Sequence, residues 1–302
     1  MTDLQLKHKV AVIGAGTMGN GIAHVFAQCG YPITMIDVSA EALSKGMATL
    51  QKNLERMVVK EKISSVVRDQ TLARIKTSTD MESAVNDATL VIEAATENVD
   101  LKLRIFEGLN RFCNPDAILA SNTSSISITR IASVTNRPQQ VIGMHFMNPV
   151  PVMKLVEIIR GYSTSDSVTD EVTLLSKSLD KIPVTVNDYP GFVANRILIP
   201  MINEAIISLW EGVAGVEEID NVMKLGMAHP MGPLQLADFI GLDVVLAITR
   251  VLQDGYGQPK YAPCPLLVNM VQAGKLGVKS GEGFYVYNAG SKDLIVSPSF
   301  SR

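Results

Sequence analysis

One short segment near the start of the chain restricts the possible folds more than any other. An apolar run, Val10–Ile13, leads directly into the sequence GAGTMG at 14–19, and a helical stretch covers residues 17–30. A second apolar run, Ile33–Ile36, follows and ends at Asp37. Because a strand, a glycine turn, a helix and a second strand in this order form a βαβ unit, the segment predicts a parallel sheet with helices on its faces.

The glycine turn has the pattern that binds dinucleotide cofactors. Gly14 permits a tight turn, Gly16 lets the backbone approach a pyrophosphate, and Gly19 allows the helix to pack closely on the strand. The N–H groups at the start of the helix face a bound anion. We therefore expect the whole turn, including Thr17 and Met18, to contact the cofactor.

Asp37 determines which dinucleotide is expected. It stands 18 positions after the last glycine of the turn. A carboxylate there accepts hydrogen bonds from ribose hydroxyls and repels the additional phosphate of NADP. No arginine lies within the following ten residues, so the sequence favours NAD. The alternative is that the glycines only form a turn and that Asp37 only caps the next helix.

The pattern of the chain changes near residue 187. Before it, apolar runs alternate with helical stretches, which predicts an α/β fold with a Rossmann-type, doubly wound parallel sheet. The expected strands are Leu90–Glu93, 117–120, 141–145, 155–159 and 182–186, and the expected helices are 41–62, 98–112 and 166–180. After the sequence NDYPG at 187–191, helices are expected at 192–211, 216–226, 232–253 and 264–274.

A proline and glycine junction beside such a change of pattern is a typical domain boundary. We therefore expect an NAD-binding domain at 1–187 and a mostly α-helical domain for substrate binding and dimerisation at 188–302. The unusually apolar helix that begins the second domain favours a homodimer, although packing within one chain explains the same pattern.

The composition excludes several classes of protein. Of 302 residues, 47% are hydrophobic and 19% are charged, as in an ordinary globular protein. The net charge of -3 argues against nucleic acid as a partner. No apolar run approaches the roughly 20 residues of a membrane helix, and the start MTDLQ lacks the core of a signal peptide. Three widely spaced cysteines fit a reducing compartment and no metal site. These features predict a cytoplasmic protein.

His145 is the best candidate for acid/base chemistry among the four histidines. It ends an expected strand, and ligands of a doubly wound sheet gather beyond the carboxyl ends of the strands. Glu157 lies twelve residues later in an apolar run, where a buried carboxylate needs a partner. A histidine oriented by a carboxylate can remove a hydroxyl proton near neutral pH. The alternative is a structural histidine beside an edge-strand glutamate.

The sequence SNTSS at 121–125 follows another expected strand. Five small polar residues at this place are typical of a loop and helix cap. Their hydroxyls could equally hold a reacting oxygen. Their position alone leaves both interpretations open, a structural loop and a substrate contact.

Several of these motifs together resemble the 3-hydroxyacyl-CoA dehydrogenases, and most closely their short, single-function bacterial members that act on 3-hydroxybutyryl-CoA. The matching segments are the glycine turn with Asp37, SNTSS at 121–125, HFMNPVPVMKLVE at 145–157, PGFVANR at 190–196 and GEGFY at 281–285. Met147 stands where many relatives have phenylalanine. The resemblance implies an oxidoreductase of fatty acid metabolism.

The resemblance also implies roles for individual residues. His145 resembles the general acid/base of the family, Glu157 its carboxylate partner, and Ser124 the hydroxyl that contacts the substrate oxygen and the nicotinamide. Asn195 resembles the asparagine that binds substrate. Four further positions contact NAD in relatives, namely Glu97, Lys102, Asn148 and Lys279.

A row of basic residues is expected to contact the CoA part of the substrate. Lys45, Lys52, Arg56 and Lys60 are seven, four and four residues apart, which places them on one face of a helix. Such a row can meet the phosphates of CoA, but it is also common on solvent-exposed helices. In the family this helix contacts CoA, which implies contacts from Asn53 and Lys60.

Together these observations predict the NAD-dependent, reversible oxidation of a short L-3-hydroxyacyl-CoA to the 3-ketoacyl-CoA. Two alternatives stay open: a dehydrogenase of a free hydroxy acid or sugar acid, and a nonenzymatic NAD-binding protein like the crystallins recruited from this broader family. The presence of Ser124, His145, Glu157 and Asn195 together favours the enzyme.

Overall fold

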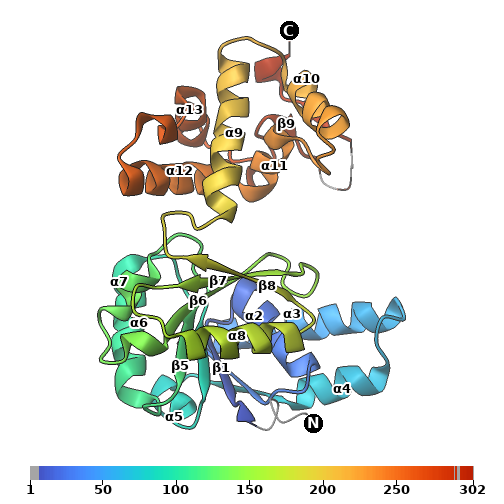
Figure 1. Cartoon of the computed structure of the whole chain (residues 1–302). Coiled ribbons are helices and arrows are strands. Elements are labelled where there is room, and N and C mark those ends of the chain that lie inside the picture. Colours follow the sequence, from blue (N-terminus) through green and yellow to red (C-terminus); the bar gives the residue numbers. More distant parts are fainter. Residues whose placement is uncertain (1–6, 289, 291–292, 302) are drawn as a thin grey trace. The chain divides into compact units, whose positions relative to one another are not determined.

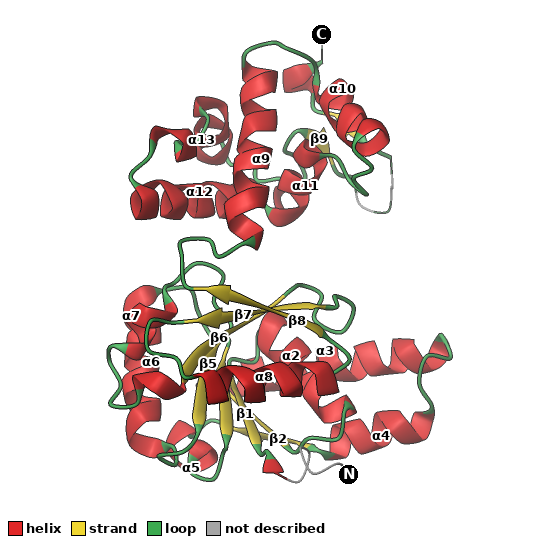
Figure 2. Ribbon diagram, in the orientation of Figure 1, coloured by secondary structure: helices red, strands yellow, loops and turns green. Residues whose placement is uncertain are grey.

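The computed structural model describes residues 7–288, 290 and 293–301, and the expectation about a signal peptide concerns residues outside these ranges. The chain divides into two compact units, of which one ends at Tyr189 and the other begins at Pro190. Figure 2 shows that the first unit contains an extensive sheet and that the second is mainly helical. We call them the sheet unit and the helical unit.

An eight-stranded sheet forms the centre of the sheet unit (Figure 1). Its strands are β1 (Val10–Ile13), β2 (Ile33–Ile36), β3 (Ile75–Ser78), β4 (Leu90–Glu93), β5 (Ile118–Ser121), β6 (Val141–Phe146), β7 (Leu155–Arg160) and β8 (Ile182–Asn187). They lie in the order β3-β2-β1-β4-β5-β6-β7-β8. Neighbouring strands from β3 to β6 run parallel, which confirms the Rossmann-type doubly wound fold.

Two details of the sheet differ from the sequence-based expectation. Strand β7 runs antiparallel to β6, because residues 147–154 join them as a loop and no helix crosses over the sheet between them. Strand β3 was not expected, since its sequence IKTS contains one strongly apolar residue. It lies at the edge of the sheet and is only partly buried, so the usual apolar run is not required there.

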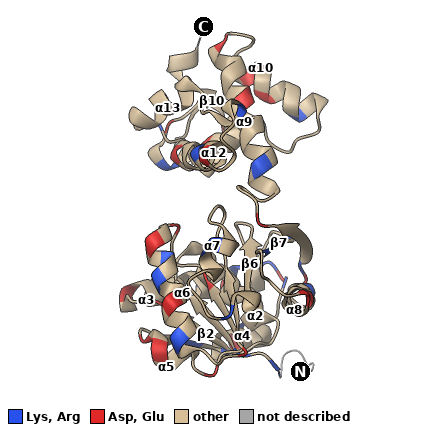
Figure 3. Ribbon diagram, turned by 60° about the vertical axis from the view of Figure 1, so that its left-hand side comes forward, with Lys and Arg blue, Asp and Glu red and all other residues tan. Residues whose placement is uncertain are grey.

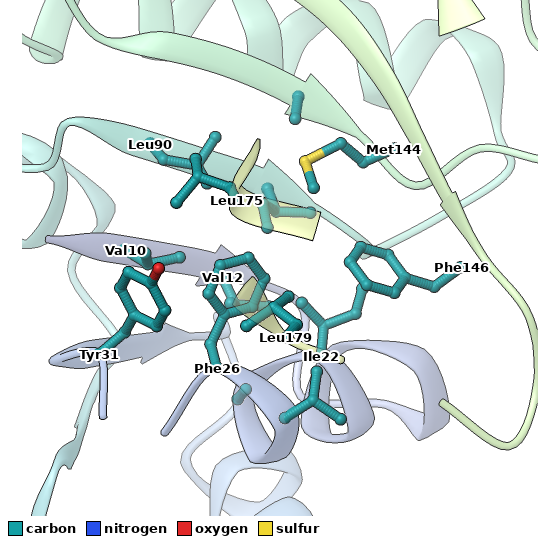
Figure 4. Packing of buried hydrophobic residues seen from close by; sticks show 14 of the residues in the cluster. Val10, Val12, Ile22, Phe26, Tyr31, Leu90, Met144, Phe146, Leu175 and Leu179 are labelled. Carbon is teal, nitrogen blue, oxygen red and sulfur yellow. The ribbon is translucent and has the colours of Figure 1, made fainter. Parts of the chain in front are cut away.

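Helices flank this sheet. They are α2 (Thr17–Gln28), α3 (Ala40–Val59), α4 (Ser65–Ala73), α5 (Met81–Val85), α6 (Val99–Phe112), α7 (Ile128–Ala132) and α8 (Asp166–Ser178). Helices α4, α5 and α7 are short and were not expected. Figure 4 shows side chains of α2 and of the α8 region packed together over the strands. In this cluster the rings of Phe26 and Tyr31 meet edge to face, with centroids 5.5 Å apart.

The helical unit contains five α-helices among its described residues, namely α9 (Ala194–Trp210), α10 (Val216–Asn221), α11 (Pro233–Ile240), α12 (Leu242–Tyr256) and α13 (Pro265–Gln272). The single helix expected at 232–253 is wrong. Gly241 has a φ of 99° and separates α11 from α12, a conformation that glycine adopts without strain.

A two-stranded hairpin of β9 (Tyr285–Val286) and β10 (Ile295–Val296) completes the helical unit. Within the described ranges, no helix is both long enough and apolar enough to cross a membrane.

Candidate active site

The glycine turn after β1 requires glycine at its first and last positions. Gly14 has a φ of +100°, and a Cβ atom there would lie 2.7 Å from the carbonyl oxygen of Ala94. A Cβ atom on Gly19 would lie 1.8 Å from the carbonyl oxygen of Gly14. The first glycine therefore lets the turn approach the end of β4, and the last lets α2 begin directly against the turn.

The middle of the turn is open. A Cβ atom on Gly16 would meet nothing within 4 Å, and Gly16 is the N-cap of α2 without a side chain to accept its first N–H groups. Asp37 accepts hydrogen bonds from the N–H of Ala15, at 2.9 Å, and of Ser39, at 3.0 Å. Its carboxylate is thus held beside the turn. Space for a pyrophosphate, N–H groups that face an anion and a fixed carboxylate fit a dinucleotide.

A cavity of about 290 Å³ opens beside this turn. It is bounded by the turn, by α2, by α3 and by the loop after β6, which supply Ala15–Thr17, Asn20–Gly21, Lys45–Gly46, Thr49, Asn53 and 148–151. Four predicted contact residues therefore line one space, namely Gly16, Thr17, Asn53 and Asn148. Lys60 is the exposed C-cap of α3 and is not part of this lining. Figure 3 shows charges of both signs on this unit, and Lys45 pairs with Glu41 at 2.7 Å.

His145 and Glu157 lie opposite each other on β6 and β7. The antiparallel register pairs the two residues directly, and Nδ1 of His145 lies 2.8 Å from Oε2 of Glu157. The side chain of Glu157 is 3% exposed and that of His145 is 11% exposed. The carboxylate therefore holds one ring nitrogen and fixes the plane of the imidazole.

Glu97 contacts the loop that follows β5. Its Oε1 accepts hydrogen bonds from the N–H of Ser124, at 2.7 Å, and from the Ser124 hydroxyl, at 3.0 Å. Its Oε2 accepts one from the hydroxyl of Thr123, at 2.8 Å. The structure therefore brings together Glu97 and Ser124, and one carboxylate orients both the backbone and the hydroxyl of Ser124.

A buried ionic cluster lies under these loops and was not recognised in the sequence. Lys102 is 1% exposed, and its Nζ forms an ion pair with Glu93 and lies 3.3 Å from Oγ of Ser121. Glu93 also accepts a hydrogen bond from the N–H of Ala95 at 2.9 Å. The cluster links the carboxyl ends of β4 and β5 to α6. Lys102, a predicted NAD contact, points into this cluster.

Asn122 also has a structural role that was not recognised in the sequence. Its Oδ1 accepts a hydrogen bond from the N–H of Phe146 at 2.9 Å, and Phe146 directly follows His145. The side chain at the end of β5 therefore fixes the backbone at the end of β6. A polar residue at a strand end was the only signal in the sequence.

Two predicted site residues belong to the helical unit. Asn195 is the second residue of α9. Lys279 lies in a 3₁₀ turn at Val278–Ser280 and forms an ion pair with Asp243, the second residue of α12.

The turn admits a pyrophosphate, and the carboxylate after the second strand is positioned for a ribose. This combination is characteristic of an NAD-dependent dehydrogenase. Comparison with known proteins narrows this class. The model of the 3-hydroxyacyl-CoA dehydrogenase NAD binding domain matches residues 9–189, and that of the C-terminal domain of the same enzymes matches residues 191–287. The chain belongs to the 3-hydroxyacyl-CoA dehydrogenase family. The resemblance seen in the motifs and the expectation of NAD as cofactor are thus confirmed.

Individual relatives are similar over nearly their whole length. A probable 3-hydroxybutyryl-CoA dehydrogenase of Bacillus subtilis is 55% identical over 92% of this chain and 97% of its own. The mitochondrial hydroxyacyl-coenzyme A dehydrogenase of Rattus norvegicus is 42% identical over 93% of this chain and 91% of its own. The crystal structure of an (S)-3-hydroxybutyryl-CoA dehydrogenase from Ralstonia eutropha is 53% identical, with a TM-score of 0.91 over 93% of this chain and 99% of that one.

Proposed function

We propose that the chain catalyses the NAD-dependent, reversible oxidation of a short L-3-hydroxyacyl-CoA, 3-hydroxybutyryl-CoA, to the 3-ketoacyl-CoA. The buried contact between His145 and Glu157 carries the proposal, since it supplies an acid/base group at the carboxyl edge of an NAD-binding sheet. The names of relatives that are more than 50% identical support the choice of substrate.

Residues of β6 and β7 transfer the proton of the substrate hydroxyl. Bound NAD supplies the hydride acceptor for C3 of the substrate. His145 takes the hydroxyl proton at Nε2, and the carboxylate of Glu157, bonded to Nδ1, stabilises the imidazolium that results. In the reverse direction the imidazolium returns this proton to the ketone oxygen.

Two further residues hold the substrate in this proposal. The hydroxyl of Ser124, oriented by Glu97, contacts the reacting oxygen, and the amide of Asn195 is the second proposed substrate contact. Donors that are oriented in advance stabilise charge as it develops at the oxygen atoms. The sheet unit thus serves as the NAD-binding domain, and the helical unit as the domain for substrate binding and dimerisation.

The remaining predicted contacts are assigned to the two ligands. Gly14, Gly16, Met18, Asp37 and Asn148 surround the dinucleotide together with the rest of the turn. For Lys102 and Lys279 an NAD contact stays a prediction, since each side chain forms an ion pair in the structure. The lining of the cavity by Asn53 supports a CoA contact there, and Lys60 is the second proposed contact at the end of α3.

The exposed surface of the helical unit supports a homodimer. Ile197 and Trp210 of α9 are 67% and 56% exposed, and Val213 and Leu225 are 73% and 84% exposed. A mainly apolar cavity of about 370 Å³ opens near Val213, beside α9 and α10. A second copy of the chain would cover this apolar surface, and light scattering of the purified protein would report twice the mass of one chain. The proposed location of the enzyme is the cytoplasm.

The consumption of NADH in the presence of acetoacetyl-CoA tests the function. We expect turnover with acetoacetyl-CoA and little with free acetoacetate. His145→Gln should retain NADH binding and lose about 10²–10⁴ in kcat, whereas the control His229→Gln should behave as the parent. Preference for free acetoacetate would favour a hydroxy acid dehydrogenase. NADH binding without any turnover would favour a crystallin-like protein.

A further inference from the structure

Lys181 is a buried cation immediately before β8. The residue is 7% exposed, and its Nζ donates hydrogen bonds to the carbonyl oxygens of Val150, at 2.5 Å, and Met153, at 2.8 Å. Burial lowers the pKa of its ammonium group. In the described part of the chain it forms no ion pair, so main-chain carbonyls bind its charge. Because a buried ammonium is costly, packing alone would favour an apolar side chain at this position.

The two carbonyls belong to the loop that joins the strands of the proposed acid/base pair. Residues 147–154 connect β6 to β7, and residues 148–151 form one wall of the cavity beside the glycine turn. The carbonyl oxygen of Pro149 accepts the N–H groups of Val152 and Met153, at 2.9 and 3.0 Å. This part of the loop is therefore a compact turn, and Lys181 binds it at two points.

The same loop also packs on α2. Val150 is 2% exposed, and a Cβ atom on Gly21 would lie 2.9 Å from the Cβ atom of Val150. Helix α2 begins at the glycine turn. The cavity wall is thus held by two sets of contacts, one with α2 and one with the ammonium group of Lys181.

We propose that Lys181 is a positioning residue that holds residues 148–153 against the cavity beside the glycine turn, where Asn148 is a proposed NAD contact, and so sets the affinity for NADH. It acts through two carbonyl groups and does not itself touch the cofactor. The inference extends the proposed function but rests on NADH binding alone, which can be measured without any acyl-CoA.

Lys181→Met is the variant that tests this role. Methionine fills a similar volume but donates no hydrogen bond, so the carbonyls of Val150 and Met153 lose their common partner. We expect NADH, titrated by its fluorescence, to bind at least tenfold more weakly, with kcat at saturating NADH changed less than twofold. Lys154→Met is the matched control. Lys154 is an exposed lysine at the end of the same loop, paired with the exposed Asp180, and its loss should leave NADH binding unchanged.

The NADH dissociation constant decides the outcome. If Lys181 had only a structural role, Lys181→Met would melt at a lower temperature but bind NADH within twofold of the parent, and this result would overturn the proposal. An equal loss of affinity in Lys154→Met would also overturn it. Should Lys181→Met not fold, the same criterion applies to Lys181→Gln, whose amide can still donate to one carbonyl and should bind NADH with intermediate affinity. Absence of turnover with acetoacetyl-CoA in the parent would instead reject the proposed function.

Discussion

Replacement of Glu157 by glutamine tests the proposed acid/base pair most directly. The glutamine side chain has nearly the same shape, and its carbonyl oxygen can still accept a hydrogen bond from Nδ1 of His145. The position of the ring is therefore retained. The substitution removes the negative charge that faces the imidazolium during the reaction. Because Glu157 is almost completely buried, water cannot replace this charge.

The expected loss follows from the geometry of the pair. With Nδ1 and Oε2 2.8 Å apart, the centres of the two charges lie about 4 Å apart, and at an effective dielectric constant of about 20 such charges attract by about 4 kcal/mol. Each 1.4 kcal/mol in the barrier changes the rate tenfold. We therefore expect kcat of Glu157→Gln to fall by about a thousandfold in the oxidation of the hydroxyacyl-CoA, the direction in which the imidazolium forms.

The assay follows NAD reduction with 3-hydroxybutyryl-CoA at saturating concentrations of both. The NADH dissociation constant should stay within about twofold, because Glu157 does not line the glycine-turn cavity. Glu82→Gln, which replaces an exposed glutamate on α5, is the control and should retain full activity. A fall in kcat of less than tenfold, in a variant that melts like the parent, would show that the charge of Glu157 does not assist proton transfer.

Three further predictions concern other charged groups. Lys102→Met leaves Glu93 buried without its ion pair and should lower the free energy of unfolding by about 3–5 kcal/mol, measured in urea. The double variant Lys102→Met/Glu93→Gln should recover most of the lost stability. If the losses of stability of the two single variants added up in the double variant, the pairing would be contradicted. Asp37→Ser removes a repelling charge and should improve kcat/KM for NADPH relative to NADH at least tenfold; an unchanged ratio would argue against that repulsion. Burial raises the pKa of the Asp238 carboxyl to about 6, above its value in the unfolded chain. The folded state therefore binds the proton more tightly, and the resulting contribution to stability is present at low pH. This contribution should decline by about 1 kcal/mol between pH 5 and pH 7. Unfolding of Asp238→Asn should lack this decline, and the same slope in both proteins would refute the assignment.

The sequence predicted much of the fold because its apolar runs coincide with buried strands. The runs at Val10–Ile13 and Leu90–Glu93 are buried at every position, as strands covered on both faces must be. Strand β3 could not be predicted in this way. It contributes hydrogen bonds to β2 at the sheet edge, and its side chains are too exposed to require an apolar pattern.

The buried charges show a different limit of sequence analysis. A charged residue in a helix or beside a strand normally indicates a surface position, and this rule fails for Lys102 and Lys181. Each is buried because a specific partner lies opposite, Glu93 in one case and two loop carbonyls in the other. Those partners come from other elements of the sheet unit, so only the folded chain shows them.

The strand order explains how the cofactor turn and the acid/base pair belong to one site. Strands β1, β4, β5 and β6 are consecutive neighbours, and their parallel direction brings their carboxyl ends to one edge. Polar contacts connect each end to the next. The N–H of Ala94, after β4, donates to the carbonyl oxygen of Ile13 in β1 at 2.8 Å. Glu93 accepts a hydrogen bond from Ser121 of β5, and Asn122 accepts one from the backbone N–H after His145. With strands about 4.8 Å apart, the glycine turn and His145 lie three strand spacings apart, about 14 Å.

The antiparallel strand β7 then places Glu157 beyond His145, on the side away from the cofactor turn. Because the two strands are antiparallel, the start of β7, where Glu157 is the third residue, lies beside the carboxyl end of β6, and Glu157 pairs directly with His145.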